Sequence, residues 1–443
     1  MLTTQTECAA RNLLERMADA RRESDALFDM VRPSALYDRP IPERHRIIFY
    51  VGHLEAFDWN LLHTRFSNVK SFDPRLDQLF AFGIDPVDGG LPSDRASDWP
   101  SVESVREYVG KIRADLDKAL ERHDRLTGYE AADGFSLGLL LNVAVEHRLM
   151  HVETLSYMLH QLPFASKVRR PAVPLLNTAA VSHRMITIPA GVATLGLPRA
   201  GGSFGWDNEY EAYTVSVPAF EIDKYKVTNR QYLEFMNAGG YETRSIWSDE
   251  DWAWKAAAGV QHPSFWTKAN GEWVLRGMFD EVPLPREWPV YVSHAEARAY
   301  ARWAGKALPT EEEWHRAAYG TSKGTERDYP WGNNAPDATF GNFDLRGWDP
   351  MPVNAFPKGA SAFGVEDMLG NGWEWTVSHF APFPRFEPFP FYPGYSANFV
   401  DGKHFVMKGG SARTAKCMLR RTFRNWFQAH YPYIYSGFRC VSR

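Results

Sequence analysis

The sequence predicts two domains of different class, an all-helical bundle followed by a loop-rich domain of mixed helices and strands. Its 443 residues exceed what one hydrophobic core usually serves, so two cores are expected. Apolar residues recur at helical spacing near the N-terminus, whereas most of the 16 Trp lie in the C-terminal half together with most of the Gly and Pro. We therefore predict a four-helix bundle over residues 1–165, a linker over 166–184 and a second domain over 185–443.

Four segments of the first domain have the apolar period of amphipathic helices. They cover about residues 5–31, 43–64, 101–120 and 138–161. Proline residues follow the first segment, and a long loop rich in Gly, Pro and Asp separates the second segment from the third. Four helices of this length with one long crossover are typical of a four-helix bundle.

Three histidines are predicted to face the interior of this bundle. His147 and His151 are four residues apart on the apolar face of the last helix, which is a metal-chelating spacing. A buried pair satisfied by hydrogen bonds would explain this spacing equally well. His53 lies on the inward face of the second helix, so three nitrogens could bind one metal and leave positions open for substrate and oxygen. Other histidines of the bundle, such as His160, are interpreted as solvated.

Composition restricts the class of partner and the cellular compartment. The net charge is -4 and no long Lys/Arg run occurs, which argues against nucleic acid or an anionic membrane as partner and favours a small molecule. No 18 apolar residues run together, and the three cysteines fit neither a disulfide framework nor a zinc knuckle. These features predict a cytoplasmic protein, and they leave its oligomeric state open.

The second domain is predicted to contain short strands and a few well-marked helices. Alternating residues over 185–191 and 213–217 indicate strands. Capping-box patterns that begin at Thr228, Ser293 and Thr310 each predict the start of a short helix. Long loops rich in Gly, Pro, Asn and Trp fill the rest, and loops of that length inside a domain are usually functional.

Several motifs of this domain resemble those of the formylglycine-generating-enzyme (sulfatase-modifying factor) family. They lie at residues 226–229, 303–314, 330–332, 367–376, 408–411 and 437–440. The resemblance implies a variant of the C-type lectin fold and a scaffold that can bind calcium. Enzymes of that family carry two catalytic cysteines, but Thr414 and Leu419 occupy those places here, with Cys417 between them. The domain is therefore expected to serve another function.

A DinB-like bundle fused to this domain resembles the iron-dependent sulfoxide synthases of ergothioneine biosynthesis over essentially the whole chain. These enzymes use non-haem Fe(II) and O2 to join a thiol to C2 of the imidazole of hercynine, which is N-α-trimethylhistidine. The resemblance implies that His53, His147 and His151 bind the iron. It also implies that Asn425 and Trp426, in a Phe-Arg-Asn-Trp element, hold the trimethylammonium group, for which an aromatic face is chemically suited.

Two departures from the family pattern favour cysteine over γ-glutamylcysteine as the thiol donor. Phe427 stands where members that use γ-glutamylcysteine have an Asp, and Arg95 is the only arginine over residues 83–99, where those members have more. Arg420 or Arg421 is then a candidate partner for the carboxylate of cysteine, since a guanidinium matches a carboxylate with two parallel hydrogen bonds.

The family also places a tyrosine near the iron as donor to the oxygen intermediate. Tyr395 is the first candidate for this role, and Tyr392, Tyr431 and Tyr433 are alternatives. Two rival functions stay open at this point. One is another enzyme of the same architecture, such as a synthase that uses histidine instead of hercynine or a metal-dependent thiol transferase, and the other is a non-catalytic protein that only binds a small molecule.

Overall fold

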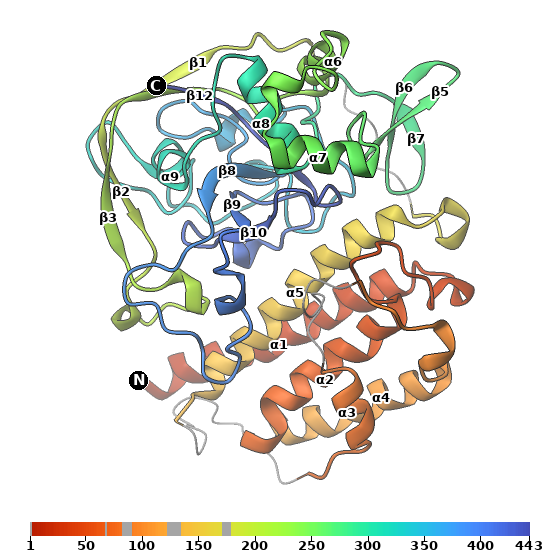
Figure 1. Ribbon diagram of the computed structural model, residues 1–443. Coiled ribbons are helices and arrows are strands. Elements are labelled where there is room, and N and C mark those ends of the chain that lie inside the picture. The colour runs from red at the N-terminus through yellow and green to blue at the C-terminus, as the bar shows by residue number, and fades with distance from the viewer. Residues whose placement is uncertain (1, 67–68, 82–90, 122–133, 171–178) are drawn as a thin grey trace. The chain divides into compact units, whose positions relative to one another are not determined.

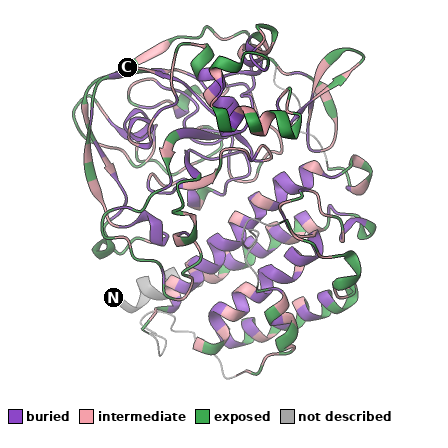
Figure 2. Cartoon of the chain, viewed as in Figure 1, coloured by how far each residue is buried: buried purple, intermediate pink, exposed green. Residues whose placement is uncertain are grey.

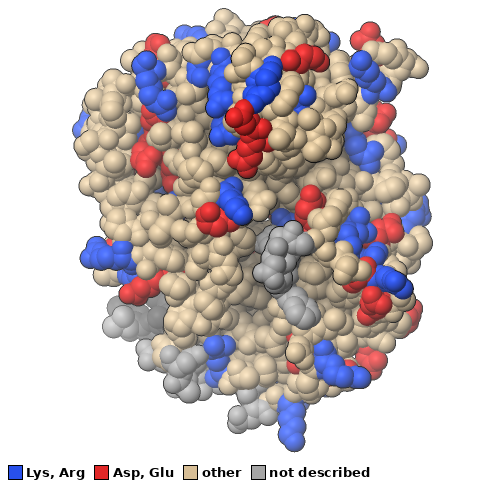
Figure 3. Space-filling view, viewed as in Figure 1, with Lys and Arg blue, Asp and Glu red and all other residues tan. Residues whose placement is uncertain are grey.

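The computed structural model describes residues 2–66, 69–81, 91–121, 134–170 and 179–443. The chain divides into two compact units, Met1–Arg170 and Pro171–Arg443. None of the described helices has both the length and the apolar character that crossing a membrane requires. On the face shown in Figure 3, acidic and basic side chains are interspersed.

The first unit is a bundle of four long helices with one short additional helix (Figure 1). The helices are α1 (Leu2–Phe28), α2 (Ile47–Phe66), α3 (Pro74–Leu79), α4 (Val102–Glu121) and α5 (Leu137–Gln161). Helix α1 packs mainly on α5, and α2 packs on α4 and α5. The predicted four-helix bundle is confirmed. The sequence reasoning missed α3, a helix of 6 residues.

Helix α5 is buried along almost its whole length (Figure 2). A helix that is buried on every side needs no polar face, so the one-sided amphipathic pattern predicted for it is wrong. The prediction that His160 is solvated fails for the same reason, because this residue is only 4% exposed. Helix α4 does have the expected single buried face, which includes Val105, Tyr108 and Ile112.

The second unit combines short helices with four small sheets. Its helices are α6 (Asn229–Asn237), α7 (Asp249–Ala258), α8 (His294–Trp303) and α9 (Glu311–Tyr319). Complete capping boxes open α6, α8 and α9, with Thr228, Ser293 and Thr310 as the capping residues, so all three predicted helix starts are confirmed. Helix α9 packs on β2, β3, β8 and β9 and contributes the buried Trp314 to the core.

The strands of this unit are short and mostly antiparallel. The first sheet has the order β1-β4-β12, with β1 (Met185–Ile188), β4 (Phe220–Asp223) and β12 (Val441–Ser442). The second has the order β10-β9-β8-β11, with β10 (Asn425–Gln428), β9 (His404–Lys408), β8 (Trp373–His379) and β11 (Ser436–Gly437). The others are β2-β3 (Gly191–Leu195, Tyr213–Val217) and β5-β6-β7 (Trp266–Ala269, Glu272–Arg276, Glu281–Pro283).

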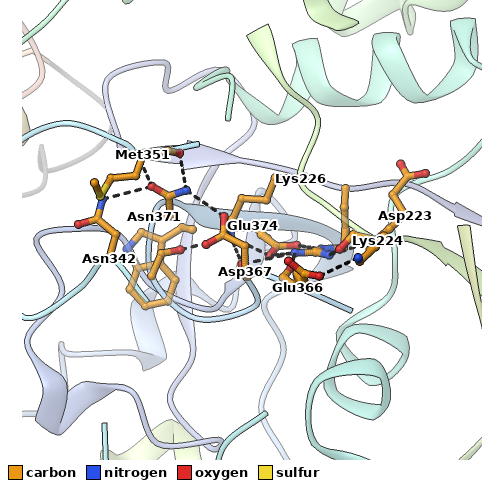
Figure 4. Close-up of polar contacts among 12 residues, drawn as sticks. Asp223, Lys224, Lys226, Asn342, Met351, Glu366, Asp367, Asn371 and Glu374 are labelled. Atoms are coloured by element: carbon orange, nitrogen blue, oxygen red, sulfur yellow. Dashed lines mark hydrogen bonds and ion pairs between the residues drawn. The ribbon is translucent and has the colours of Figure 1, made fainter. Parts of the chain in front are cut away.

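The motif at residues 367–376 is explained by a buried ionic network (Figure 4). The Lys226 ammonium lies 3.3 Å from Asp367 Oδ2 and 3.3 Å from Glu374 Oε1. Glu374 also accepts two hydrogen bonds from Arg439, at 2.6 and 2.9 Å. The Asn371 amide donates to Asp367 Oδ2 at 2.9 Å and fixes the backbone of Met351. These motif residues therefore hold the fold together.

Asp367 gives this network a pH dependence that can be measured. Burial raises the pKa of Asp367 from its ordinary value of 3.8 to about 6, although Lys226 and Asn371 oppose the shift. The folded state holds the Asp367 proton more tightly than the unfolded chain does. The protonated carboxyl group therefore stabilises the fold at low pH, and this contribution is lost as the pH rises from about 4 to about 6. The change amounts to at most about 3 kcal/mol.

We expect Asp367→Asn to lack this contribution. The difference in unfolding free energy, wild type minus variant, should fall between about pH 4 and about pH 6 and stay level above that range. Unfolding followed by tryptophan fluorescence at several pH values measures it. Parallel stability curves for the two proteins would contradict the assignment.

Candidate metal centre

Helix α5 brings two imidazoles together in the interior of the first unit. His147 and His151 are separated by one helical turn, so both side chains leave the same face. Their Nε2 atoms are 3.1 Å apart, and the two side chains are 3% and 5% exposed. The predicted inward orientation of both residues is confirmed.

Helix α2 adds the third imidazole. The His53 ring centroid lies 5.4 Å from that of His147 and 4.9 Å from that of His151. One nitrogen from each of the three residues lies within 4.8 Å of the other two. Among the described residues, no other group of three or more His, Cys, Asp or Glu side chains is close enough to hold a metal ion.

The orientation of His53 is fixed by the end of α3. His53 Nδ1 lies 2.6 Å from the carbonyl oxygen of Phe80. A carbonyl oxygen can only accept, so Nδ1 carries the proton and Nε2 keeps a lone pair for a metal. The contact depends on Gly52, because a Cβ atom at that position would lie 2.4 Å from the Phe80 ring.

Burial keeps the three imidazoles neutral. It is the largest cause that lowers the pKa of His53 to about 4, and it lowers the pKa of His147 and of His151 well below the ordinary value. The neighbouring histidines act in the same direction. Neutral imidazoles are the form that binds metal ions.

Aromatic side chains pack around the three histidines. The Phe57 ring stacks on His147 with centroids 3.4 Å apart, and the Phe49 ring stacks on His53 at 4.8 Å. Phe49 and Phe57 lie four residues before and after His53, so they share its face of α2. This spacing was visible in the sequence, but its function as a wall of the site was missed.

The residue that follows His147 fixes the register of α5 against α2. Arg148 is 1% exposed and donates to Glu55 Oε1 at 2.9 Å and to Asp58 Oδ2 at 2.5 Å. It also donates to the carbonyl oxygen of Leu54 at 3.0 Å. All three partners lie within five residues of His53 on α2, so Arg148 holds the two helices that carry the histidines together. Sequence reasoning did not find this network.

The donor set fits a divalent transition metal. Metal–imidazole bonds are about 2.1 Å long, so a single ion can contact two nitrogens that are 3.1 Å apart. The buried Nδ1 of His151 has no hydrogen-bond partner among the described residues. Three nitrogens with no carboxylate suit iron, zinc, nickel or copper and disfavour calcium and magnesium.

Two of the other predicted site residues lie together in the second unit. The Trp426 indole meets the Tyr395 ring edge-on at 5.5 Å and stacks on Phe380 at 4.1 Å. Trp206 also stacks on Tyr395, with centroids 4.0 Å apart. Trp426 and Tyr395 are therefore parts of one aromatic cluster, although 31 residues separate them in the sequence.

Neighbouring residues of β10 point in alternating directions. Asn425 is adjacent to Trp426, and its side-chain oxygen accepts a hydrogen bond from the backbone N–H of Trp426 at 2.9 Å. Phe427, on the opposite face of the strand from Trp426, stacks on Tyr431 at 5.2 Å, and Tyr431 meets Tyr433 edge-on. Among the candidate tyrosines, Tyr395 and not Tyr431 thus contacts Trp426.

Arg420 already has a carboxylate partner within the protein. Its Nε donates to Glu209 Oε2 at 2.8 Å, its Nη2 donates to the other oxygen of Glu209, and its Nη1 donates to the Cys417 carbonyl at 3.0 Å. Arg421 pairs with Glu326 at 3.1 Å. A substrate carboxylate at either arginine would compete with these glutamates.

Two further expectations concern the second unit. Thr414 and Leu419, which replace the two catalytic cysteines, are both fully buried, and the Thr414 hydroxyl accepts the Ser411 N–H at 2.8 Å. Among the described residues of this unit, no three acidic side chains lie close enough together to bind calcium. Calcium binding stays a prediction.

Comparisons with known proteins agree with this architecture. Residues 16–155 match the DinB superfamily, and residues 173–443 match the sulfatase-modifying factor enzyme 1-like domain. The chain is 35% identical over 402 residues to hercynine oxygenase of Mycolicibacterium thermoresistibile, covering 86% of each protein. It is 36% identical over 349 residues to hercynine oxygenase of Mycolicibacterium smegmatis, covering 76% of this chain and 77% of that one.

A fungal protein shows a similar relation. The chain is 28% identical to ergothioneine biosynthesis protein 1 of Neurospora crassa, in an alignment 500 positions long that covers 93% of this chain and 55% of the fungal protein. The bacterial relatives match over most of both lengths and the fungal one over almost all of this chain. With its bundle, its second domain and its buried histidine triad, the chain belongs to the hercynine oxygenase family.

Proposed function

We propose that the protein is a non-haem Fe(II), O2-dependent sulfoxide synthase of ergothioneine biosynthesis. It joins the thiol of cysteine to C2 of the hercynine imidazole and gives S-(hercyn-2-yl)cysteine S-oxide. The observation that carries the proposal is the buried triad of His53, His147 and His151, in a chain whose relatives over most of its length are hercynine oxygenases. One O2 balances the reaction, because one oxygen atom enters the sulfoxide and the other leaves as water.

The triad supplies the ligands that this chemistry needs, and neighbouring aromatic side chains supply the apolar surroundings. Bound Fe(II) would supply O2 activation and would ease deprotonation of the thiol. His53, His147 and His151 would hold the ion with neutral nitrogens, and the Phe80 carbonyl keeps Nε2 of His53 available. Phe49 and Phe57 pack on the imidazoles and exclude water from that side.

Asn425 and Trp426 are proposed to recognise the trimethylammonium group of hercynine. A quaternary ammonium has no hydrogen to donate, so an aromatic face and an amide dipole are suitable partners. Trp426 is half-buried on β10, and Phe380 holds its ring in place by stacking on it. Tyr395, whose ring lies 5.5 Å from the Trp426 indole, is proposed as the acid that supplies a proton during the reaction.

Trp426→Ala is expected to weaken hercynine binding and to leave iron binding unchanged. A cation over a tryptophan face is stabilised by up to about 2 kcal/mol, so KM for hercynine should rise up to about 30-fold. Trp426→Phe should recover part of the loss. Steady-state kinetics with hercynine as the varied substrate measures both variants. An unchanged KM in the alanine variant would contradict the assignment.

Cysteine is proposed as the thiol donor, with γ-glutamylcysteine as the alternative. Phe427 supports cysteine, because an aromatic ring stacked on Tyr431 offers no charge to the larger thiol. Arg420 would take part in binding the cysteine carboxylate only if Glu209 shared it. Competition between the two thiols for the iron-loaded protein, with hercynine and with histidine as acceptors, tests the substrate assignment. Product from histidine alone, or from γ-glutamylcysteine alone, would overturn it.

A further inference from the structure

One short stretch of the second unit is linked to both Tyr395 and the Trp426 strand. It comprises Trp206 and the single helical turn Asp207–Glu209, and is called here the 206–209 segment. Its residues Trp206, Asp207 and Glu209 are all fully buried. The sequence motifs pointed to none of them.

Glu209 holds the chain that leads into β10. Its Oε2 accepts a hydrogen bond from Arg420 Nε at 2.8 Å and one from the Thr422 hydroxyl at 2.6 Å. Its other oxygen accepts a hydrogen bond from Arg420 and, at 2.9 Å, one from the backbone N–H of Trp206. A buried carboxylate with this many donors fixes their geometry, and Thr422 lies four residues before Trp426.

Asp207 holds the loop that carries Tyr395. Asp207 Oδ1 accepts the hydroxyl of Ser396 at 2.7 Å, and Ser396 is fully buried. Ser396 directly follows Tyr395, whose ring stacks on Trp206 at 4.0 Å with an interplanar angle of 25°. The tyrosine is thus held by its neighbour's hydroxyl and by an aromatic face.

The two connections end on rings that touch each other. Tyr395 meets the Trp426 indole at 5.5 Å and 77°. Arg424, which directly precedes β10, donates to both oxygens of Glu311 at 2.9 and 3.0 Å and to the carbonyl oxygen of Asn208, within the 206–209 segment, at 3.4 Å. The relative position of the tyrosine and the indole therefore depends on the 206–209 segment.

We propose that Asp207 and Glu209 are positioning residues that set the phenol of Tyr395 against the hercynine-binding face of Trp426. This inference rests on the proposed function, since it assigns Tyr395 and Trp426 their roles in that reaction. Glu209 acts on substrate binding through the Arg420–Thr422 stretch. Asp207 acts on the chemical step through Ser396 and Tyr395.

Kinetics of single variants separate the two connections. Glu209→Gln is expected to raise KM for hercynine about tenfold with a smaller effect on kcat, because a displacement of about 1 Å suffices for such losses. Ser396→Ala is expected to lower kcat about tenfold and to leave KM for hercynine within about twofold. Thr422→Val removes one hydrogen bond to Glu209 and should raise KM less, which provides a milder test if Glu209→Gln does not fold.

Glu287→Gln is the matched control. Glu287 is also buried and also pairs with an arginine, since Arg230 Nε donates to it at 2.8 Å. It belongs to neither the aromatic cluster nor the 206–209 segment, so its kinetic constants should stay close to those of the wild type. Equal kinetics for Glu209→Gln and Glu287→Gln, or a parallel fall in kcat for Glu209→Gln and Ser396→Ala with KM unchanged, would overturn the inference.

Hydrogen exchange of the substrate-free protein separates this inference from the proposed function. Glu209→Gln should speed exchange of backbone amides over residues 420–428, and Ser396→Ala over residues 389–396, relative to Glu287→Gln. If the wild type does not turn over hercynine, the proposed function fails and the exchange data alone decide. Unchanged exchange in both segments would then overturn the positioning role.

Discussion

His151→Ala is expected to remove iron binding and to lower turnover by at least about 100-fold. Loss of a residue that only supports a metal ligand lowers affinity or activity by up to about 100-fold, and loss of a ligand should cost at least as much. The physical reason is that His151 offers one of the three nitrogens that could hold the ion, in a group that contains no carboxylate. Its Nε2 lies 3.1 Å from that of His147, so its loss leaves two ligands, too few to retain a divalent ion firmly. Metal analysis of the purified protein and the rate of O2 consumption measure the two effects.

His63→Ala is the control for this prediction. His63 lies on α2 like His53, but its Nδ1 donates to the Trp59 carbonyl at 2.7 Å and its ring stacks on Trp59. Its removal should leave iron content and turnover close to the wild-type values. An iron content that is equally high in His151→Ala and His63→Ala would refute the triad as the metal site.

Arg148→Ala is expected to destabilise the first unit by about 3–5 kcal/mol, because removing one partner leaves a buried carboxylate without its counter-ion. Of the two carboxylates, Asp58 would lose the most stabilisation. Arg148 is its close partner at 2.5 Å, whereas Glu55 keeps Arg113 at 2.8 Å. Burial already raises the pKa of Asp58 even with Arg148 present. Thermal and denaturant unfolding measure the loss of stability.

The pH dependence of this loss gives a second check. A carboxyl group whose folded pKa lies above its unfolded value favours the folded state at low pH and loses that contribution as the pH rises. The loss of stability of Arg148→Ala relative to wild type should therefore be larger at neutral pH than in mild acid.

Lys111→Ala is the control. It breaks an exposed i,i+4 pair with Asp115 and should lower the free energy of unfolding by less than about 0.5 kcal/mol. A similar cost for both variants would argue against the network.

Local sequence signals predicted the features that depend on local chemistry. The spacing of His147 and His151 predicts one shared helix face, and that face is buried. The boxes at Thr228, Ser293 and Thr310 each cap a helix, because a hydroxyl and a carboxylate or amide three residues later satisfy backbone groups within one turn. His53 was found on its helix face by the same periodicity.

The features that sequence reasoning missed depend on contacts between distant segments. Arg148 looks like an ordinary charged helix residue until Glu55 and Asp58, about 90 residues away, surround it. Glu209 lies 211 positions before Arg420, and no local pattern links the two. Helix α5 carries buried charges, so its periodicity alone could not predict that it is buried on every side.

The most direct test of the proposed function is the reaction of the iron-loaded protein with hercynine and cysteine under air. The proposal predicts one O2 consumed for each hercynine converted, and a product heavier than the combined substrates by one oxygen atom less two hydrogens. It also predicts that His151→Ala forms no product, whereas His63→Ala does. An iron-loaded wild type that consumes no O2 with this pair and leaves hercynine unchanged would contradict the proposed function.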